Sequence, residues 1–372
     1  MLFSRRLIVF ALLSGPAAAA VQSDAETLAA ILAAQRAVHL APDLEEHRLN
    51  LASLYLQAGR NRGAIDTLRD YLLLQPGASK PLRLISAAYL RQEDYVPAKD
   101  AAERALRAGP RDSAGFQLLA MAQLGLGAMD AAEALLREAL KLDPRSVEAN
   151  LQLGLLFAKQ SRNLVEGIRL LEKARDLQPG LAGTYAALGS AQLQNGNARQ
   201  AAAALEKSIQ LAPNGADGYY LLANVYRQLH QDEKADATLA SFDRLKKVDA
   251  DLRAREMRGR ASYEEGVQLL SNTEELDKAY AALSKAAAEL PTFDPAYYRM
   301  AQVSYLKSDL PRALASIRKA LEINPLEPEY YYVLARCLED SDRPAALDAI
   351  EKAVNLRPGI PDFEELLREL KK

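Results

Sequence analysis

Apolar residues recur along this 372-residue chain at the spacing of amphipathic helices. In residues 185–213, YAALGSAQLQNGNARQAAAALEKSIQLAP, they return at steps of three and four positions. The polar, glycine-containing segment QNGN interrupts this pattern once, and a proline ends it. Such a segment predicts two helices joined by a tight turn. The pattern returns over most of the chain, which indicates an all-α protein built from helix pairs.

Prolines mark the ends of these segments at a nearly constant spacing. Neighbouring prolines stand 33 to 35 residues apart, apart from one interval of 78 that holds a repeat of 34 residues and one of 44. In the longer repeat Lys247 occupies the place where a proline is expected. A fixed period of this length is typical of repeat arrays. The prolines are at positions 42, 76, 110, 144, 179, 213, 291, 325 and 358.

Two positions of the repeat always carry a small side chain. Small residues allow the two helices of a pair to cross closely, so that each pair offers an apolar face to the next pair. In the first helix the small residues are Ala52, Ser86, Ala120, Gly154, Gly189, Ala223, Gly266, Ala301 and Ala335. In the second helix they are Ala64, Ala98, Ala132, Gly167, Ala201, Ala235, Ala279, Ala313 and Ala346.

The period, the small positions and the closing proline together resemble the tetratricopeptide repeat (TPR) family. This resemblance implies an all-α, right-handed superhelical solenoid of antiparallel helix pairs with nine full repeats. We expect repeats one to six in residues 45–247 and repeats seven to nine in residues 259–358. Open-ended solenoids need solvating end helices, which we place in a capping half-repeat at 21–44 and a capping helix at 359–372.

The segment SFDRLKKVDADLRAREMRGR, residues 241–260, falls out of step with the repeats. It contains no proline, and acidic residues precede basic residues by four positions at 243/247, 249/253, 251/255 and 256/260, a spacing that stabilises exposed helices. We therefore expect an extended helical spacer at 248–258. Three roles remain open for it: a rigid spacer, a hinge near Gly259, or a docking helix.

The N-terminus has the pattern of a cleavable signal peptide at residues 1–20. Arg5 and Arg6 precede the apolar run LIVFALL, and AAAA at 17–20 offers a cleavage site after Ala20. No later stretch is apolar enough to span a membrane, so we expect an exported bacterial protein that is periplasmic or secreted, with no membrane span after signal removal. The segment SRR leaves general secretion and twin-arginine export both open.

Composition argues against several classes of function. The formal net charge is −2, with both signs interspersed, which is not the electrostatic pattern of a nucleic-acid-binding protein. Cys337 is the single cysteine, so no intramolecular disulfide can form, and at its helix position we expect a buried small side chain. The histidines have no ligand partners at metal-binding spacing, and no catalytic or phosphate-binding motif occurs. We therefore expect no enzyme, no metal and no cofactor.

The resemblance implies a binding site on the concave surface, which the first helices line. At the fifth position of these helices, four successive repeats carry a tyrosine, and polar residues stand nearby. A tyrosine ring with its hydroxyl suits peptide backbones, aromatic side chains or sugar rings, although the same ring can also pack against adjacent helices. The candidate ligand-binding or peptide-binding residues are Tyr220, Asn224, Arg227, Tyr263, Tyr298, Gln302, Tyr305, Tyr332 and Arg336.

Two functions follow from this surface. The first is a non-catalytic extracytoplasmic scaffold or adaptor that binds a protein or peptide segment in a bacterial envelope assembly or secretion process. The alternative is a carbohydrate-binding module for exported polysaccharide or peptidoglycan, in which the tyrosines would stack on envelope glycan. The absence of tryptophan weighs against the alternative, because tryptophan offers the larger stacking surface.

Overall fold

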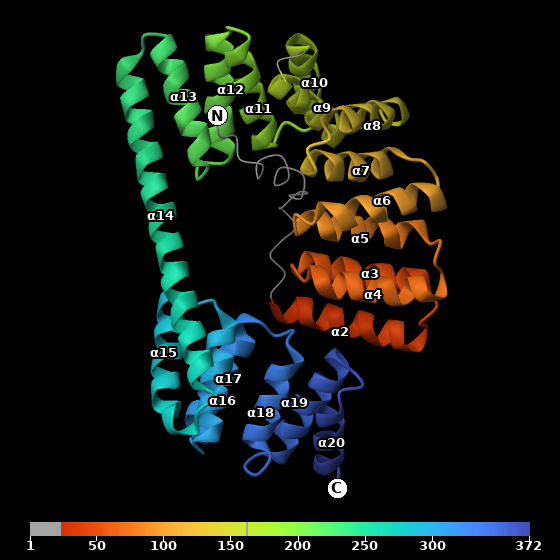
Figure 1. Ribbon diagram of the computed structural model, residues 1–372, viewed down its shortest axis with the longest axis vertical. Helices are drawn as coiled ribbons and strands as arrows, with labels where there is room; N and C mark the ends of the chain where they lie inside the picture. Colours follow the sequence, from red (N-terminus) through yellow and green to blue (C-terminus); the bar gives the residue numbers. More distant parts are fainter. Residues whose placement is uncertain (1–23, 161–162) are drawn as a thin grey trace. The chain divides into compact units, whose positions relative to one another are not determined.

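The computed structural model describes residues 24–160 and 163–372, and every regular element in this part of the chain is helical (Figure 1). The predicted signal peptide, residues 1–20, lies outside the described residues. Contacts divide the chain into two compact units. Among the described residues, the first unit contains Pro42–Val248, and the second contains residues 24–41 together with Asp249–Lys372.

The first unit consists of consecutive antiparallel helix pairs that end in the first half of a long helix, α14, Asp232–Leu269. Each pair corresponds to one predicted repeat, with α3 and α4 forming the first. The helices before α14 are α3 Glu45–Gln57, α4 Asn61–Leu74, α5 Ser79–Arg91, α6 Tyr95–Ala108, α7 Ser113–Gly125, α8 Met129–Leu142, α9 Val147–Gln160, α10 Leu164–Leu177, α11 Ala182–Gln194, α12 Ala198–Leu211 and α13 Ala216–Gln228.

The second unit contains the last repeats and the N-terminal helix. The second half of α14 supplies the first helix of repeat seven, and α15 supplies the second. The other elements are α2 Asp24–Leu40, the short 3₁₀ helix η1 Thr273–Glu275, α15 Leu276–Glu289, α16 Asp294–Leu306, α17 Leu310–Ile323, α18 Pro328–Leu338, α19 Arg343–Leu356 and α20 Pro361–Leu370.

Most turns inside a helix pair contain one residue with positive φ. Gly59, Gly127 and Gly196 adopt φ values of 72°, 82° and 79°, which glycine tolerates because it has no Cβ atom. Ser308 at φ 60° and His230 at φ 56° occupy the same turn in their repeats. His230 is exposed there, so its place is explained by the turn.

The small positions of the repeat are buried where paired helices cross, as predicted. The crossing of α9 and α10 has glycine at the small position of both helices. A Cβ atom added at Gly154 would lie 2.7 Å from Leu171 Cγ and 2.9 Å from the carbonyl oxygen of Gly167. A Cβ atom at Gly167 would in turn lie 3.0 Å from the Gly154 carbonyl oxygen. At this crossing, glycine on both helices is what allows the backbones to approach.

Substituting Gly154 with alanine is therefore expected to destabilise the first unit by about 1–3 kcal/mol, because backbone atoms must move to admit the methyl group. Urea unfolding followed by circular dichroism measures this loss. Gly77→Ala is the matched control, since no atom lies within 4 Å of a Cβ added at Gly77. Equal stability of the two variants would show that the helices do not cross at Gly154.

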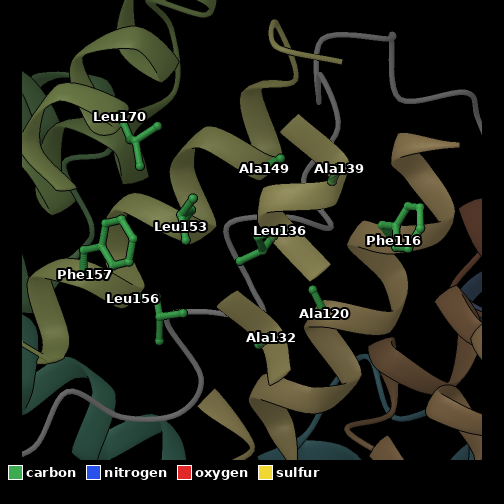
Figure 2. Close-up of a cluster of buried hydrophobic side chains, with 10 residues drawn as sticks. All are labelled: Phe116, Ala120, Ala132, Leu136, Ala139, Ala149, Leu153, Leu156, Phe157 and Leu170. Atoms are coloured by element: carbon green, nitrogen blue, oxygen red, sulfur yellow. The ribbon is translucent and has the colours of Figure 1, made fainter. Parts of the chain in front are cut away.

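Neighbouring repeats share continuous apolar clusters. Figure 2 shows one such cluster, in which side chains of α7, α8, α9 and α10 meet. Phe157 on α9 is 1% exposed, and Leu136 on α8 is fully buried. Because each helix pair covers an apolar face of the next, the core extends along the array instead of gathering at one centre.

The helix α14 runs without a break for 38 residues and includes the segment expected as a spacer. Side chains in this segment are largely exposed, among them Val248, Leu252 and Met257. Two of the predicted intrahelical ion pairs form, Asp249 with Arg253 at 2.8 Å and Glu256 with Arg260 at 3.0 Å.

Further along α14, two arginines turn to the neighbouring helix α15. Arg255 pairs with Glu289 at 3.7 Å instead of with Asp251. Arg258 donates two hydrogen bonds to the carboxylate of Glu289, at 2.9 and 3.1 Å. These contacts mark the point from which α14 packs against the rest of the second unit.

Two helices of the second unit, α20 and α2, pack against α19. Phe363, Leu366 and Leu370 of α20 are buried in the cluster that also contains Ile350 of α19. The N-terminal helix α2 belongs to the same unit, and Gln35 Nε2 donates a hydrogen bond of 3.0 Å to the carbonyl oxygen of Leu356. That α2 caps the first repeat stays a prediction.

Candidate functional site

The candidate tyrosines fall into two groups. Tyr220 lies on α13 in the first unit, together with Asn224 and Arg227. Tyr263 on α14, Tyr298 on α16 and Tyr332 on α18 lie in the second unit, on the first helices of three successive repeats. The second unit therefore brings together three tyrosines of the predicted row. The spacer expected at 248–258 also separates Tyr220 from the other three tyrosines along the sequence.

Each of these tyrosines contacts an aromatic ring of a following helix or turn. The Tyr298 ring stacks on Tyr330 with the ring centres 4.8 Å apart. The remaining pairs have ring centres 5.0 to 5.4 Å apart. The tyrosine rings therefore pack against neighbouring elements, which was the alternative to ligand binding that the sequence left open. One side of each ring is occupied by this contact. These pairs are Tyr220–Phe242, Tyr263–Phe293 and Tyr332–Phe363.

Hydrogen bonds hold Gln302 of α16 in a defined orientation. Its Nε2 atom donates to the Tyr298 hydroxyl at 2.8 Å, and its Oε1 atom accepts from Arg299 Nη1 at 2.8 Å. The Arg299 guanidinium also lies over the Tyr298 ring, 5.5 Å from its centre. Burial raises the pKa of Tyr298 although the charge of Arg299 opposes the shift, so the phenol stays protonated at neutral pH.

A second polar group joins α16 to α18. Arg336 Nη1 lies 3.1 Å from Glu339 Oε2, and Tyr305 of α16 lies close enough to raise the pKa of the same guanidinium. Burial lowers the pKa of Arg336, but Glu339 and Tyr305 outweigh it, so the pKa lies above its ordinary value. Burial also raises the pKa of Glu339, against the attraction of Arg336. The two charges are therefore partly removed from water and satisfy each other.

The structure brings Tyr298, Gln302, Tyr305, Tyr332 and Arg336 into one unit on two adjacent first helices. All five are partly buried. They offer amide, phenol and guanidinium groups, which suit hydrogen bonding to polar backbone groups of a ligand.

Sequence analysis missed two members of this surface, Arg299 and Glu339. Each stands three residues from a selected position, at the spacing where helix side chains meet: Arg299 precedes Gln302, and Glu339 follows Arg336. That spacing was the available signal. The two residues fix the selected side chains rather than add a separate feature.

Catalytic chemistry gains no support from the described residues. Within them, no group of three or more histidine, cysteine or acidic side chains could hold a metal ion. Cys337 is buried, as expected, and burial raises the pKa of its thiol to about 11. None of the helices in the described part of the chain combines the length and apolar character needed to cross a membrane.

These features define a helical repeat array with polar and aromatic side chains on its first helices. The sequence profile of the tetratricopeptide repeat matches residues 49–113, 83–145, 118–182, 186–251 and 298–361. Because these segments cover more than half of the chain, the protein belongs to the tetratricopeptide repeat family. Proteins of this family are generally non-catalytic scaffolds that bind protein or peptide segments. No curated protein matches the chain.

Several solved structures, two of them described as TPR proteins, are similar to about half of the chain. YrrB, described as a TPR protein with an unusual peptide-binding site, is 25% identical over 49% of this chain and 93% of its own, with a TM-score of 0.39. TTC0263, a thermophilic TPR protein from Thermus thermophilus, is 22% identical over 49% of this chain and 98% of its own, with a TM-score of 0.42. MamA from Desulfovibrio magneticus is 20% identical over 46% and 96%, with a TM-score of 0.42.

Proposed function

We propose that this protein is a non-catalytic extracytoplasmic scaffold that binds a protein or peptide segment in a bacterial envelope assembly or secretion process. The binding surface is the set of first-helix side chains on α16 and α18. The observation that carries the proposal is the fixed, partly buried arrangement of Gln302, Tyr305 and Arg336, whose polar groups are oriented by neighbours of the same unit.

The geometry favours a peptide over a sugar. A sugar-binding platform needs an open aromatic face, but the Tyr298 ring has Tyr330 stacked on it and the Arg299 guanidinium over it, and Tyr332 has one side against Phe363. An extended peptide presents alternating N–H and C=O groups, which the amide of Gln302 and the hydroxyl of Tyr305 can meet. Pre-orientation of these groups lowers the entropic cost of binding.

Export is supported by the sequence at the N-terminus. Arg5 and Arg6, the apolar run after them and the alanines at 17–20 together have the organisation of a cleavable signal. The single cysteine is also compatible with export, because the fold does not depend on a disulfide. The proposal therefore places the mature chain, beginning at Val21, in the periplasm or outside the cell.

Site-specific photo-crosslinking in cells tests the proposal. With a photoreactive amino acid in place of Tyr305, we expect a discrete protein adduct on the exported chain, with an N-terminus at Val21. The matched control carries the same group at Arg318, which is exposed on the second helix α17. Equal adducts at both positions, adducts with glycan alone, no adduct at position 305, or an uncleaved chain in the cytoplasm would contradict the proposal.

A further inference from the structure

The first unit contains a pocket that the surface on α16 and α18 does not include. It has a volume of about 100 Å³ and lies where the C-terminal parts of α7 and α9 meet the beginnings of α6 and α8. Its walls are mainly apolar, with one cationic side chain among them. Its lining includes Tyr95, Met121, Leu124, Met129, Leu155 and Lys159, together with the amide of Gln152.

The pocket occupies the same register as the polar surface of the second unit. Met121 and Leu155 hold the ninth position of their first helices, the position held by Gln302 and Arg336 on α16 and α18. On α7 and α9 this register is apolar, whereas on α16 and α18 it carries hydrogen-bonding groups. Two adjacent repeats have an apolar residue at this position, so both contribute an apolar wall to the pocket.

One wall of the pocket depends on a glycine. A Cβ atom at Gly125 would lie 2.2 to 2.4 Å from atoms of the Tyr95 ring, so the ring can rest against α7 only because no side chain is present. The floor is formed by Leu156, which is 4% exposed and belongs to the cluster in Figure 2. The pocket is thus built on packed helices and needs no rearrangement to exist.

Its size and lining specify the occupant. A volume of about 100 Å³ falls below the range of roughly 300–1,000 Å³ found for small-molecule sites, but it suits a single side chain of a larger ligand. Met121 and Met129 can adjust to the shape of an aliphatic group. The ammonium group of Lys159 is exposed, and within the described ranges 24–160 and 163–372 no carboxylate pairs with it.

We propose that this pocket binds an aliphatic side chain of an acidic peptide segment, and that an Asp or Glu side chain next to it pairs with Lys159. The apolar walls remove the aliphatic group from water, and the lysine favours a neighbouring carboxylate through charge complementarity. This inference rests on the proposed function and deepens it by naming the chemistry of the partner.

Methyl NMR of the chain, expressed with its native N-terminus and labelled with ¹³C at methionine methyl groups, tests the pocket directly. Met121 and Met129 line it, while Met257 and Met300 belong to the second unit and serve as internal controls. The probe is the N-acetylated, C-amidated peptide Gly-Leu-Asp-Glu-Gly at millimolar concentration. We expect shifts at Met121 and Met129 alone, and none with glycine in place of the leucine.

The proposed pairing of a peptide carboxylate with Lys159 is tested with altered peptides and one matched pair of protein variants. Replacing Asp-Glu by Asn-Gln in the peptide should weaken binding about two- to fivefold, as expected for an exposed ion pair. Lys159→Met should abolish this preference without affecting the fold, because Lys159 is exposed. Lys141→Met, an exposed lysine of α8 outside the pocket, should keep the preference.

Several results would contradict the proposed role of the pocket. They are equal shifts at all methionines, binding of the glycine peptide, binding only of a peptide with a free C-terminal carboxylate, and an unchanged acid preference in K159M. If the methyl signals of Met121 and Met129 do not shift with the peptide while position 305 captures a protein in cells, the pocket proposal is wrong and the proposed function stands. If neither responds, both are wrong.

Discussion

Replacing Phe157 with alanine is expected to lower the free energy of unfolding of the first unit by about 3–5 kcal/mol, the cost of removing a large buried aromatic side chain. Phe157 is 1% exposed, and it packs between repeats in the cluster of Figure 2. The Arg137 guanidinium also lies over its ring, 5.3 Å from the centre. Urea unfolding by circular dichroism gives the loss, and hydrogen exchange of α9 and α10 should locate it.

The control for this variant is Val165→Ala on the neighbouring helix α10. Val165 is 72% exposed, so its truncation should change stability by no more than about 0.5 kcal/mol. In a repeat array the loss falls mainly on the affected repeat and its neighbours. Stability of F157A within the range of V165A would mean that α9 does not pack against the preceding and following helices as described.

Introducing proline at Lys247 is expected to cost about 3 kcal/mol or more in local helix stability. Proline removes the backbone donor that a helix uses at this position, and its ring clashes with the carbonyl group four residues earlier. Lys247 lies inside α14, and its side chain is exposed, so the effect comes from the backbone. Hydrogen exchange should show loss of protection around residues 243–251.

Lys247→Ala is the matched control, since it removes the same side chain and keeps a strong helix former. K247A should therefore retain the protection of the parent chain. If K247P exchanges like K247A, residues 243–251 are not helical in solution. Slow exchange outside α14 in both units of K247P would show that the damage stays within this helix.

The helix pairs were predictable because their determinants are local. Small residues at a fixed position of the repeat, such as Gly154 and Gly167, indicate where the two helices of that repeat cross. In α14 the spacing of charges along the helix correctly predicted the ion pair between Asp249 and Arg253. It predicted the wrong partner for Arg255. The partner of Arg255, Glu289, stands on the next helix, and spacing within a single helix carries no information about it.

The candidate sites were less predictable because they combine side chains of different repeats. The register located Tyr298 and Gln302, but it could not show that Tyr298 stacks on Tyr330 from the following repeat. The pocket was missed for the same reason. Tyr95 reaches it from the second helix of one repeat, and Leu155 comes from a first helix two repeats later.

The burial of Cys337 also determines how the protein responds to oxidants. Thiols exposed in an oxidising compartment are captured in mixed disulfides or oxidised to sulfenic acid, through the thiolate form. With its side chain 2% exposed and its pKa raised to about 11, Cys337 offers oxidants neither access nor thiolate at neutral pH. The folded chain is therefore inert in thiol chemistry, and it can be held beside oxidising enzymes without becoming covalently linked to them.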